Sequence, residues 1–369
     1  MKVTGIESIK LRFTPKTGLA DGLAPIDSRE VFLVKVQTDE GVTGIGEGFA
    51  LGCLDSLEVM LRETVTPLVI GEDPLFKERI WEKIYRNTYR YGRRGLLASV
   101  LSAVDIALWD ITGKVANLPV YKLLGGAKTT VPAYASGGYY AQGKTVEDLM
   151  AEAAGYQRMG FGTMKMKIGA ASMALDCERV RAVRKAVGDE MNIAVDANNA
   201  YDLNEALKIS RLLEPLNICF FEEPLSGDNI EDSIRLAERT DIPIAGYETE
   251  LTRFGMRDFI TRRAVDIVQT DAIWAGGITE TRNIAVLASA WKMNCIPHFS
   301  AGAVSLAANL HLAAAMPNIP LIELTLDENP LRDKLGCSPI VLDQGNLVLP
   351  EGPGLGIEIN EAVIHEFRV

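Results

Sequence analysis

Short apolar runs with strand character alternate with longer segments of helical period through most of the chain after about residue 130. The strand-like runs are VPAYASGG (131–138), TMKMKIG (163–169), IAVDANN (193–199), CFFEEP (219–224), PIAGYETE (243–250), DIVQTDAI (266–273), CIPHFS (295–300) and LIELTL (321–326). Between them, apolar residues recur at helical spacing in 145–159, 203–216 and 278–293. This alternation, at 23 to 29 residues per unit, predicts βαβ units and a parallel sheet.

Eight strands of this kind favour a closed barrel of the TIM type. The alternative is an open, doubly wound sheet, which is weakened because no G-x-G-x-x-G motif follows an early strand. The fold class is therefore predicted to be α/β with a barrel as its main element.

The first 125 residues follow a different pattern. The runs IESIKLRF, EVFLVKVQTDEG and VTGIGEGF predict an antiparallel meander with a turn at Asp39–Gly41, and the apolar segment 94–116 predicts a well-buried helix. Short strands and turns return after about residue 330. We expect an α+β domain at 1–125, a barrel at 126–328 and a tail at 329–369 that packs back on the first domain.

Charged or titratable side chains stand near the ends of seven successive predicted strands. They are Lys167, Asp196, Glu222, Glu248, Asp271, His298 and Glu323. In a TIM barrel the carboxyl ends of the strands meet at one rim, where catalytic groups gather. We therefore expect these side chains to surround one site.

Three of these groups form an acidic trio: Asp196, Glu222 and Glu248. Each alone could be a helix cap or half of a salt bridge, but three in register favour a shared cation. A ligand set of oxygens favours Mg²⁺ first and Mn²⁺ second. Asn198 lies on the same strand face as Asp196 and is expected to reach the metal shell or the substrate.

Two lysines, Lys165 and Lys167, share one face of the second strand-like run. We expect them to face the carboxylates and to lower each other's pKa, so that a neutral amine can act as a general base. The alternative is that both extend to the rim as solvated cations.

The remaining candidates are a histidine and a glutamate. His298 and Asp271 end adjacent strands, so Asp271 is expected to accept a hydrogen bond from the imidazole; the alternative is a partly buried histidine satisfied by a loop. Glu323 is expected to be protonated and to donate to an oxyanion, or else to be a buried carboxylate paired with an arginine. His311 and His365 are expected to be structural or exposed.

Composition and charge narrow the class of protein further. The chain has 369 residues and a net charge of −11, which argues against nucleic acid or an anionic membrane as a partner. Five scattered cysteines fit a reducing cytoplasm, and neither the N-terminal segment nor 301–316 has the pattern of a leader or a membrane span. We expect a soluble cytoplasmic protein.

The order KMK, DAN, EEP, ETE, then an Asp and a His, resembles the enolase superfamily, specifically its mandelate racemase subgroup. The resemblance runs from end to end and includes the PGLG motif at 353–356. It implies a capping domain and a modified (β/α)7β barrel.

The resemblance also implies site roles. These are Mg²⁺ held by Asp196, Glu222 and Glu248; Lys167 as a base; His298 with Asp271 as an acid or base on the other face of the substrate; Lys165 beside the substrate carboxylate; and Glu323 on the enolate. The absence of a lysine in DIVQTDAIWAGG excludes the two-lysine arrangement of the muconate lactonizing subgroup. Tyr247, just before Glu248, departs from the family's small residue and is expected to reshape the pocket.

Several overall reactions remain open after removal of the proton α to a carboxylate. They are loss of water from a sugar acid, ring opening of a sugar lactone by a cycloisomerase, and racemisation or epimerisation.

The resemblance places specificity in two loops, at about 15–30 and 49–56, and implies a homo-oligomer. The rim residues expected to suit a polyhydroxylated acid are Ser136, Asn198, Asn199, Thr249, Ser300, Thr325 and Trp274. We favour an acid-sugar dehydratase. A Schiff-base aldolase has no need for three carboxylates in phase, and a non-catalytic barrel is disfavoured because no predicted ligand or base is missing.

Overall fold

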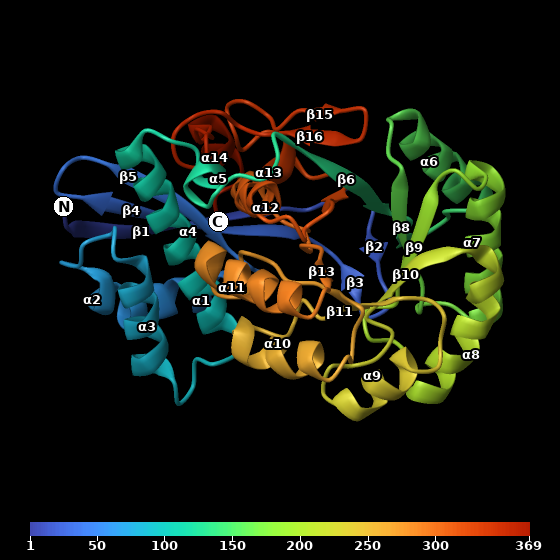
Figure 1. Cartoon of the computed structure of the whole chain (residues 1–369). Helices are drawn as coiled ribbons and strands as arrows, with labels where there is room; N and C mark the ends of the chain where they lie inside the picture. The colour runs from blue at the N-terminus through green and yellow to red at the C-terminus, as the bar shows by residue number, and fades with distance from the viewer.

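An antiparallel sheet and a set of helices form the front of the molecule in the computed structural model, which describes residues 1–369. The strands β1 (Val3–Phe13), β4 (Arg29–Thr38) and β5 (Thr43–Gly48) pair in the order β1-β4-β5. The helices are α1 (Leu54–Met60), a π-helical turn (Leu61–Val65), α2 (Thr66–Val69), α3 (Lys77–Thr88), α4 (Leu96–Ala116) and α5 (Val120–Leu123). Figure 1 shows this unit on the left, and it confirms the predicted meander and the helix at 94–116.

The glycines of β5 bring the sheet into direct contact with α4. Gly44, Gly46 and Gly48 alternate along the strand and therefore share one face. A Cβ added at Gly46 would lie 1.9 Å from the carbonyl oxygen of Ala103, and one at Gly44 would lie 2.1 Å from that of Ala107. The strand and the helix thus pack backbone against backbone.

Helix α4 is apolar around most of its circumference and is largely buried. By length and composition it could cross a membrane, but in the folded chain it packs between the front sheet and the barrel. Its buried polar groups bind distant backbone: the Ser102 hydroxyl accepts from the N–H of Gly276 at 2.9 Å, and Asp105 accepts from that of Thr279 at 2.9 Å. These bonds fix how the helix is turned toward the barrel.

Eight parallel strands and seven helices form the barrel. The strands are β6 (Thr130–Gly137), β8 (Thr163–Lys167), β9 (Asn192–Asp196), β10 (Ile218–Glu222), β11 (Ile244–Gly246), β12 (Ile267–Val268), β13 (Asn294–Cys295) and β14 (Ile322–Thr325). The helices between them are α6 (Val146–Arg158), α7 (Met173–Val187), α8 (Leu203–Leu213) with a 3₁₀ turn (Glu214–Leu216), α9 (Ile230–Ala237), α10 (Thr252–Thr261), α11 (Gly277–Ala290) and α12 (Ala303–Ala315). The order runs β13-β12-β11-β10-β9-β8-β6, and β14 pairs with the other edge of β6.

Each predicted barrel strand is present, but most are shorter than predicted. The ends of the predicted runs belong to loops at the carboxyl edge, for example after Asp196 and after Val268. These loops contain polar residues of the predicted site. The predicted runs included them and therefore extended beyond the last residue that pairs in the sheet. The α/β barrel class is confirmed.

The tail contacts both parts of the molecule. It contains α13 (Pro330–Asp333), β15 (Leu342–Asp343), β16 (Asn346–Val348) and α14 (Glu361–Phe367). Strand β16 pairs antiparallel with β6 of the barrel, while Arg368 forms a bridge with Leu11 of β1. The expected return to the front unit is therefore accompanied by a pairing with the barrel. The division at 125 and 328 remains our proposal.

The segment 15–30 is joined to the barrel by a small sheet. Its strands β2 (Leu19–Ala20) and β3 (Pro25–Ile26) pair with each other, and β2 also pairs with β7 (Tyr140–Ala141), which follows β6. Figure 1 shows β2 and β3 beside the barrel strands. This pairing holds the segment over the carboxyl edge of the barrel.

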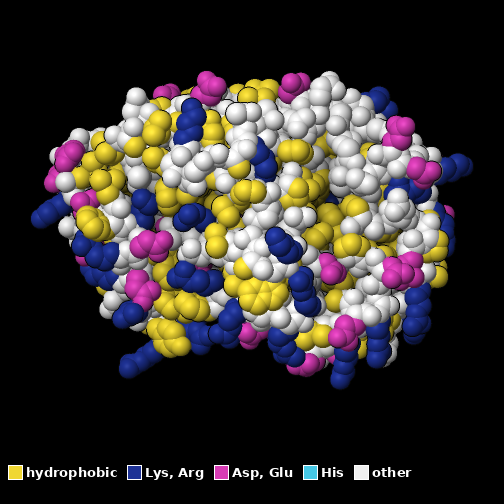
Figure 2. Space-filling model, in the orientation of Figure 1, with side chains coloured by type: hydrophobic (Ala, Val, Ile, Leu, Met, Phe, Trp, Pro, Cys, Tyr) yellow, Lys and Arg dark blue, Asp and Glu magenta, His cyan; other side chains and the backbone are white.

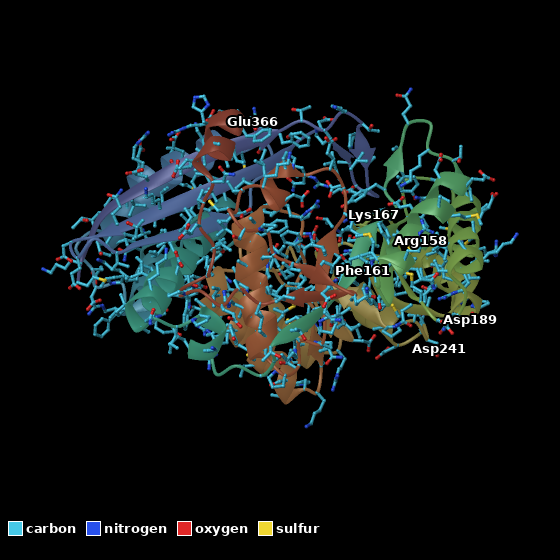
Figure 3. All side chains as sticks on the ribbon, turned by 90° about the horizontal axis from the view of Figure 1, so that it is seen from above. Arg158, Phe161, Lys167, Asp189, Asp241 and Glu366 are labelled. Carbon is cyan, nitrogen blue, oxygen red and sulfur yellow. The ribbon has the colours of Figure 1, made fainter.

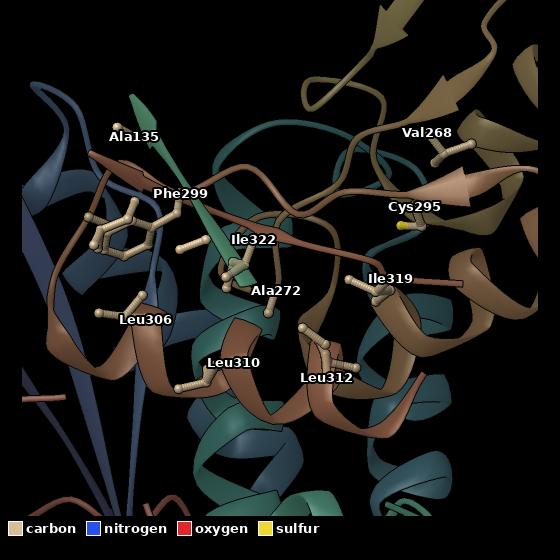
Figure 4. Packing of buried hydrophobic residues seen from close by; sticks show 14 of the residues in the cluster. Ala135, Val268, Ala272, Cys295, Phe299, Leu306, Leu310, Leu312, Ile319 and Ile322 are labelled. Atoms are coloured by element: carbon tan, nitrogen blue, oxygen red, sulfur yellow. The ribbon is translucent and has the colours of Figure 1, made fainter. Parts of the chain in front are cut away.

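Two large apolar clusters support the fold, and the larger one also includes front-unit residues such as Leu11, Leu33 and Ile106. One fills the barrel and its helices, and Figure 4 shows part of it, where Leu306 and Leu310 of α12 pack beneath Phe299 and Ile322. The other lies between the front sheet and α1 to α4. On the outer face in Figure 2, acidic and basic side chains are interspersed around small apolar patches.

Candidate active site at the carboxyl edge of the barrel

A pocket of about 180 Å³ lies between the front unit and the carboxyl ends of the barrel strands. From the barrel, the predicted residues that line it are Lys167, Asn198, Glu248, His298 and Glu323. The front unit contributes residues of both predicted specificity loops, including Ile26, Arg29, Phe49 and Leu51. In Figure 3, Lys167 lies on the barrel side that faces the front unit, whereas Asp189 and Asp241 lie toward the opposite end. A larger cavity of about 670 Å³ beside Tyr89 and Phe254 contains none of the predicted site residues.

Lys165 lies beneath the pocket among three carboxylates. Its Nζ is 2.5 Å from Oε1 of Glu222, 2.8 Å from Oε1 of Glu323 and 3.3 Å from Oδ2 of Asp196. The side chain is 1% exposed. The two lysines therefore do face the carboxylates, and the alternative of solvated cations at the rim is wrong.

The charge of Lys165 does lower the pKa of Lys167, as predicted, but the net shift of both lysines is upward, so the expected neutral amine is not found. Burial alone would lower the pKa of Lys167, but the charge of Asp196, whose Oδ2 lies 2.5 Å from the Lys167 Nζ, outweighs it and raises that pKa. For Lys165, burial is likewise outweighed, chiefly by Glu222, and the pKa is raised. The carboxylates dominate because they lie within 2.5 to 3.3 Å of the ammonium groups, and an opposite charge this close favours the charged form of a lysine.

The three carboxylates of the acidic trio are buried together, but the lysines do not affect their pKa values equally. Burial would raise the pKa of Asp196, but Lys167 and Lys165 hold it below its usual value. Burial and the neighbouring Asp196 raise the pKa of Glu222 to about 8, against the opposing charge of Lys165. Burial also raises the pKa of Glu248.

These carboxylates fit a hard divalent cation by their chemistry. All their donor atoms are oxygens, the side chains are buried, and Oε2 of Glu248 has no hydrogen-bond partner. No three Asp, Glu, His or Cys side chains converge on one point: Lys165 contacts both Asp196 and Glu222, and Lys167 pairs with Asp196. Asp196, Glu222 and Glu248 thus remain our proposed ligands.

A fourth buried acid, Glu223, was missed from the sequence. It lines the pocket, accepts a hydrogen bond from Nδ2 of Asn199 at 2.8 Å, and leaves Oε1 without a partner. Burial, followed by the charge of Glu248, raises its pKa well above the ordinary value. The second acid of EEP was the available signal, but strand alternation placed it on the outer face. The positive φ of Glu223, 39°, turns it inward instead.

Asn198 also faces the pocket. Its backbone N–H donates to Oδ1 of Asp196 at 2.9 Å, while its side-chain oxygen is buried without a partner. Of the other polar rim residues predicted, Asn199, Thr249, Ser300 and Trp274 line the pocket. Ser136 and Thr325 do not, since both are buried within the paired strands β6 and β14.

The predicted pair of His298 and Asp271 is present. Nδ1 of His298 lies 3.0 Å from Oδ2 of Asp271, and Nε2 lies 3.5 Å from Oε1 of Glu248. Burial alone would lower the pKa of His298, but Glu248 and the hydrogen bond to Asp271 raise it to about 10. The imidazole is therefore held as a cation that can give up a proton.

Glu323 differs from the expectation of a protonated donor. Its Oε2 accepts from the N–H of Phe299 at 3.0 Å, and its Oε1 pairs with Lys165. Burial would raise its pKa, but the charges of Lys165 and His298 lower it to about 2. In this arrangement Glu323 is an ionised acceptor, and its partner is a lysine rather than an arginine.

Tyr247 does not reshape the pocket as expected. Its ring is fully buried against Phe259, and its hydroxyl lies 2.9 Å from Oγ of Ser233 on α9. The side chain therefore points into the outer layer of the barrel, and the large residue before Glu248 is accommodated there.

Two front-unit contacts were not foreseen from the sequence. Nε of Arg29 donates to Oδ2 of Asp327 at 2.7 Å, which ties the start of β4 to the loop after β14. Phe49 stacks on Trp274 with ring centroids 3.7 Å apart, which forms an apolar wall of the pocket. Such contacts join residues more than 200 positions apart in the sequence, so no local sequence pattern predicts them.

Comparisons with known families agree with this geometry. A family described as "Enolase C-terminal domain-like" matches residues 148–363, and "Mandelate racemase / muconate lactonizing enzyme, N-terminal domain" matches residues 21–125.

Curated relatives resemble the chain over most of their length. The chain is 48% identical over 339 residues to an arabinonate dehydratase of Saccharolobus solfataricus, covering 92% of this chain and 91% of that protein. It is 34% identical over 381 residues to a D-galactarolactone cycloisomerase of Agrobacterium fabrum, covering 100% and 99%. It is also 34% identical over 354 residues to a D-galactonate dehydratase of Ralstonia pickettii, covering 92% and 91%.

Solved structures share the whole fold. The 3,6-anhydro-D-galactonate cycloisomerase from Zobellia galactanivorans is 34% identical, with a TM-score of 0.92 and full coverage of both chains. A racemase from Streptomyces coelicolor A3(2) with bound magnesium is 27% identical, with a TM-score of 0.92 and full coverage of both chains.

Proposed function

The chain belongs to the enolase superfamily, in its mandelate racemase branch, and we propose that it is a lyase that removes water from a sugar acid. The observation that carries this proposal is one pocket lined by two acid–base groups, Lys167 and His298, above a set of buried carboxylates. A single pocket with both groups suits removal of a proton α to a carboxylate and donation of a proton to the group that leaves.

Mg²⁺ fits the buried oxygen donors, and the magnesium-bound racemase of the same fold supports it. We propose Asp196, Glu222 and Glu248 as its ligands, with Mn²⁺ as a second choice. When bound, the ion supplies a Lewis acid that stabilises charge developing on the carboxylate oxygens of the substrate. A divalent cation also competes with Lys165 and Lys167 for the same carboxylates.

Each side chain of the site then has its own role in the proposed reaction. Lys165, beside Glu222 and Glu323, supplies a fixed positive charge for the substrate carboxylate. Asp196 raises the pKa of Lys167, so the lysine must first lose a proton to solvent, which becomes possible once that ion pair is weakened. The neutral Nζ then takes the proton from C2. The electron pair of that C–H bond is first held in the enediolate of the substrate carboxylate, and it then forms the C2–C3 double bond as the hydroxyl leaves C3.

His298 serves the departing group. Asp271 holds the proton on Nδ1, so Nε2 is the atom that faces the reaction. Nε2 donates its proton to the departing oxygen, which leaves as water. The resulting enol tautomerises to a 2-oxo-3-deoxy acid. Glu323 and Asn198 are proposed to orient the oxygens of the substrate.

The relatives favour dehydration over the other outcomes. The arabinonate dehydratase shares nearly half of its aligned residues with this chain, and the galactonate dehydratases share a third. Ring opening of a sugar lactone is the second candidate, because a galactarolactone cycloisomerase aligns over the full chain. Racemisation or epimerisation uses the same first step and needs a proton returned on the opposite face of C2.

The experiment is a proton NMR panel in D₂O. The protein with Mg²⁺ is incubated with arabinonate, galactonate, galactarate and galactarolactone, and with 2-hydroxy acids. For at least one sugar acid we expect deuterium at C2 of the recovered acid and loss of water to a product with deuterium at C3, all abolished by EDTA and by Lys167→Met. Conversion of a lactone without loss of water would identify a cycloisomerase. Absence of exchange and of turnover with every acid would refute the proposal.

We also propose that the protein is a cytoplasmic homo-oligomer that acts on small molecules and binds neither nucleic acid nor membranes. The net charge of −11 supports the last point, because nucleic acids and anionic lipids repel an acidic surface. Light scattering of the purified protein tests the oligomeric state directly.

A further inference from the structure

The hydroxyl of Ser300 has only one of its two hydrogen-bonding roles filled. Ser300 follows β13, two positions after His298, and lines the same pocket. Its Oγ lies 2.9 Å from Nη1 of Arg29. A guanidinium group can only donate, so the serine oxygen is the acceptor in this bond. The hydroxyl proton remains, and it forms no hydrogen bond to another protein atom.

Arg29 is rigidly held, and this fixes the serine. Its Nε and Nη2 both contact Oδ2 of Asp327, at 2.7 Å and 2.6 Å. Its guanidinium carbon also lies 5.9 Å from the ring centroid of Tyr139, and the side chain is 9% exposed. A buried, paired arginine has few alternative rotamers. The acceptor side of Ser300 is therefore permanently occupied, and the hydroxyl proton is left to donate toward the pocket.

We propose that Ser300 is a specificity-determining donor that binds a hydroxyl oxygen of the sugar acid beyond C3, with Arg29 as its positioning residue. The inference rests on the proposed function, which supplies the polyhydroxylated substrate. His298 serves the oxygen that leaves C3, so its neighbour on the same loop meets the next part of the chain. An oxygen acceptor satisfies Ser300, whereas a deoxy carbon leaves the donor unpaired, and that penalty discriminates between acids.

The test compares Ser300→Ala with the wild-type protein on the sugar acid found by NMR and on its 4-deoxy and 5-deoxy analogues. We expect kcat/KM for the parent acid to fall about 5- to 150-fold, the range for losing a partner of a desolvated polar group. For the analogue that lacks the recognised oxygen, the same substitution should leave kcat/KM unchanged. An equal loss on all three acids, or no loss on any, would overturn the proposal.

Three further variants separate recognition from structure. Ser300→Thr keeps the hydroxyl and should retain discrimination between parent and analogue. Arg29→Met should reproduce the pattern of Ser300→Ala, since it frees the acceptor side of the serine; a uniform loss on all acids would make Arg29 merely structural. Ser289→Ala, on an exposed serine of α11, is the matched control and should change nothing.

The proposed reaction and the role of Ser300 can fail independently. If the wild-type protein binds sugar acids without turning them over, the reaction is refuted. The same comparison of parent and deoxy acids, made with dissociation constants from calorimetry, then decides the role of Ser300.

Discussion

His298 and Asp271 form a hydrogen bond, and the other carboxylate oxygen of Asp271 also accepts hydrogen bonds. While Oδ2 of Asp271 meets Nδ1 of His298, its Oδ1 accepts from Nδ2 of Asn309 at 2.9 Å and from the N–H of Ile273 at 3.1 Å. Both oxygens of a fully buried carboxylate are thereby satisfied. The imidazole is held in one orientation by a group that cannot itself rotate.

Asp271→Asn should impair catalysis without removing the pocket. The amide nitrogen would donate where the carboxylate accepts, so it would force the other tautomer on His298. We expect kcat to fall by about 10²- to 10⁴-fold, the usual contribution of a positioned acid or base. Thermal unfolding should show that the variant is folded. Asp189→Asn, an exposed acid at the opposite end of the barrel, is the control.

Variants of the two acid–base residues, Lys167 and His298, should lose different steps of the reaction. Lys167→Met should abolish deuterium uptake at C2 together with dehydration, because no base remains. His298→Asn should retain uptake at C2 and lose elimination by about 10²- to 10⁴-fold, because the departing hydroxyl lacks a proton donor. Proton NMR in D₂O reports both. Identical profiles for the two variants would contradict the assigned division of roles.

Mg²⁺ should stabilise the fold through the acidic trio. A ligand present at 100 times its Kd adds about 2.7 kcal/mol to the free energy of unfolding. Calorimetry with and without EDTA should therefore show a higher Tm with Mg²⁺. The double variant Asp196→Asn, Glu222→Gln should lose this rise. Glu205→Gln, which keeps the acceptor oxygen of the capping box at the start of α8, should keep it.

His311 should make the protein sensitive to mild acid. Its Nδ1 accepts from the N–H of Tyr121 at 3.2 Å, and its Nε2 lies 3.1 Å from the carbonyl oxygen of Leu355. Burial lowers its pKa from 6.5 to about 4, against the hydrogen bond to the Leu355 carbonyl, which raises it. The unfolded chain thus binds the proton more readily, and stability is lost as pH falls from 6.5 toward 4.

The size of that effect follows from the two pKa values. Between pH 7 and pH 5 this residue alone should lower the free energy of unfolding by about 2 kcal/mol. Urea unfolding at both pH values, compared with His311→Gln, measures it. The variant should show a smaller difference between the two pH values, and an unchanged difference would exclude His311 as the cause.

Gly46→Ala should destabilise the front unit. Its added Cβ would meet the carbonyl oxygen of Ala103 at 1.9 Å, so α4 must move away from β5. We expect a loss of about 1–3 kcal/mol, typical of overpacking. Gly162→Ala is the matched control, because no atom lies within 4 Å of its added Cβ. Equal urea midpoints for the two variants would show that α4 yields easily.

Much of the barrel follows from its repeating pattern. Lys167, Asp196 and Glu222 end consecutive strands, and in-register pairing of β8, β9 and β10 places them side by side. The local rule that successive strand ends meet at one rim was sufficient for this part of the site.

The protonation states were not predictable in the same way. Lys165 was expected to respond to Lys167, but its pKa is governed by Glu222 and Glu323, which come from strands far along the chain. Glu223 was missed because its orientation depends on a backbone conformation outside the strand pattern. Contacts between the front unit and the barrel, such as that of Arg29 with Asp327, depend on the packed tertiary structure alone.

Helix α4 carries a further consequence for how the chain is made. Asp110 accepts a hydrogen bond at 2.9 Å from the N–H of Leu355, which lies 245 positions later in the sequence. At about 5–20 residues per second, roughly 12 to 50 s separate the synthesis of these two residues. Throughout that interval an apolar helix with inward-facing acids lacks its final partners. The front unit of a nascent chain therefore completes its packing only after Leu355 has been made, and α4 lacks this partner throughout that interval.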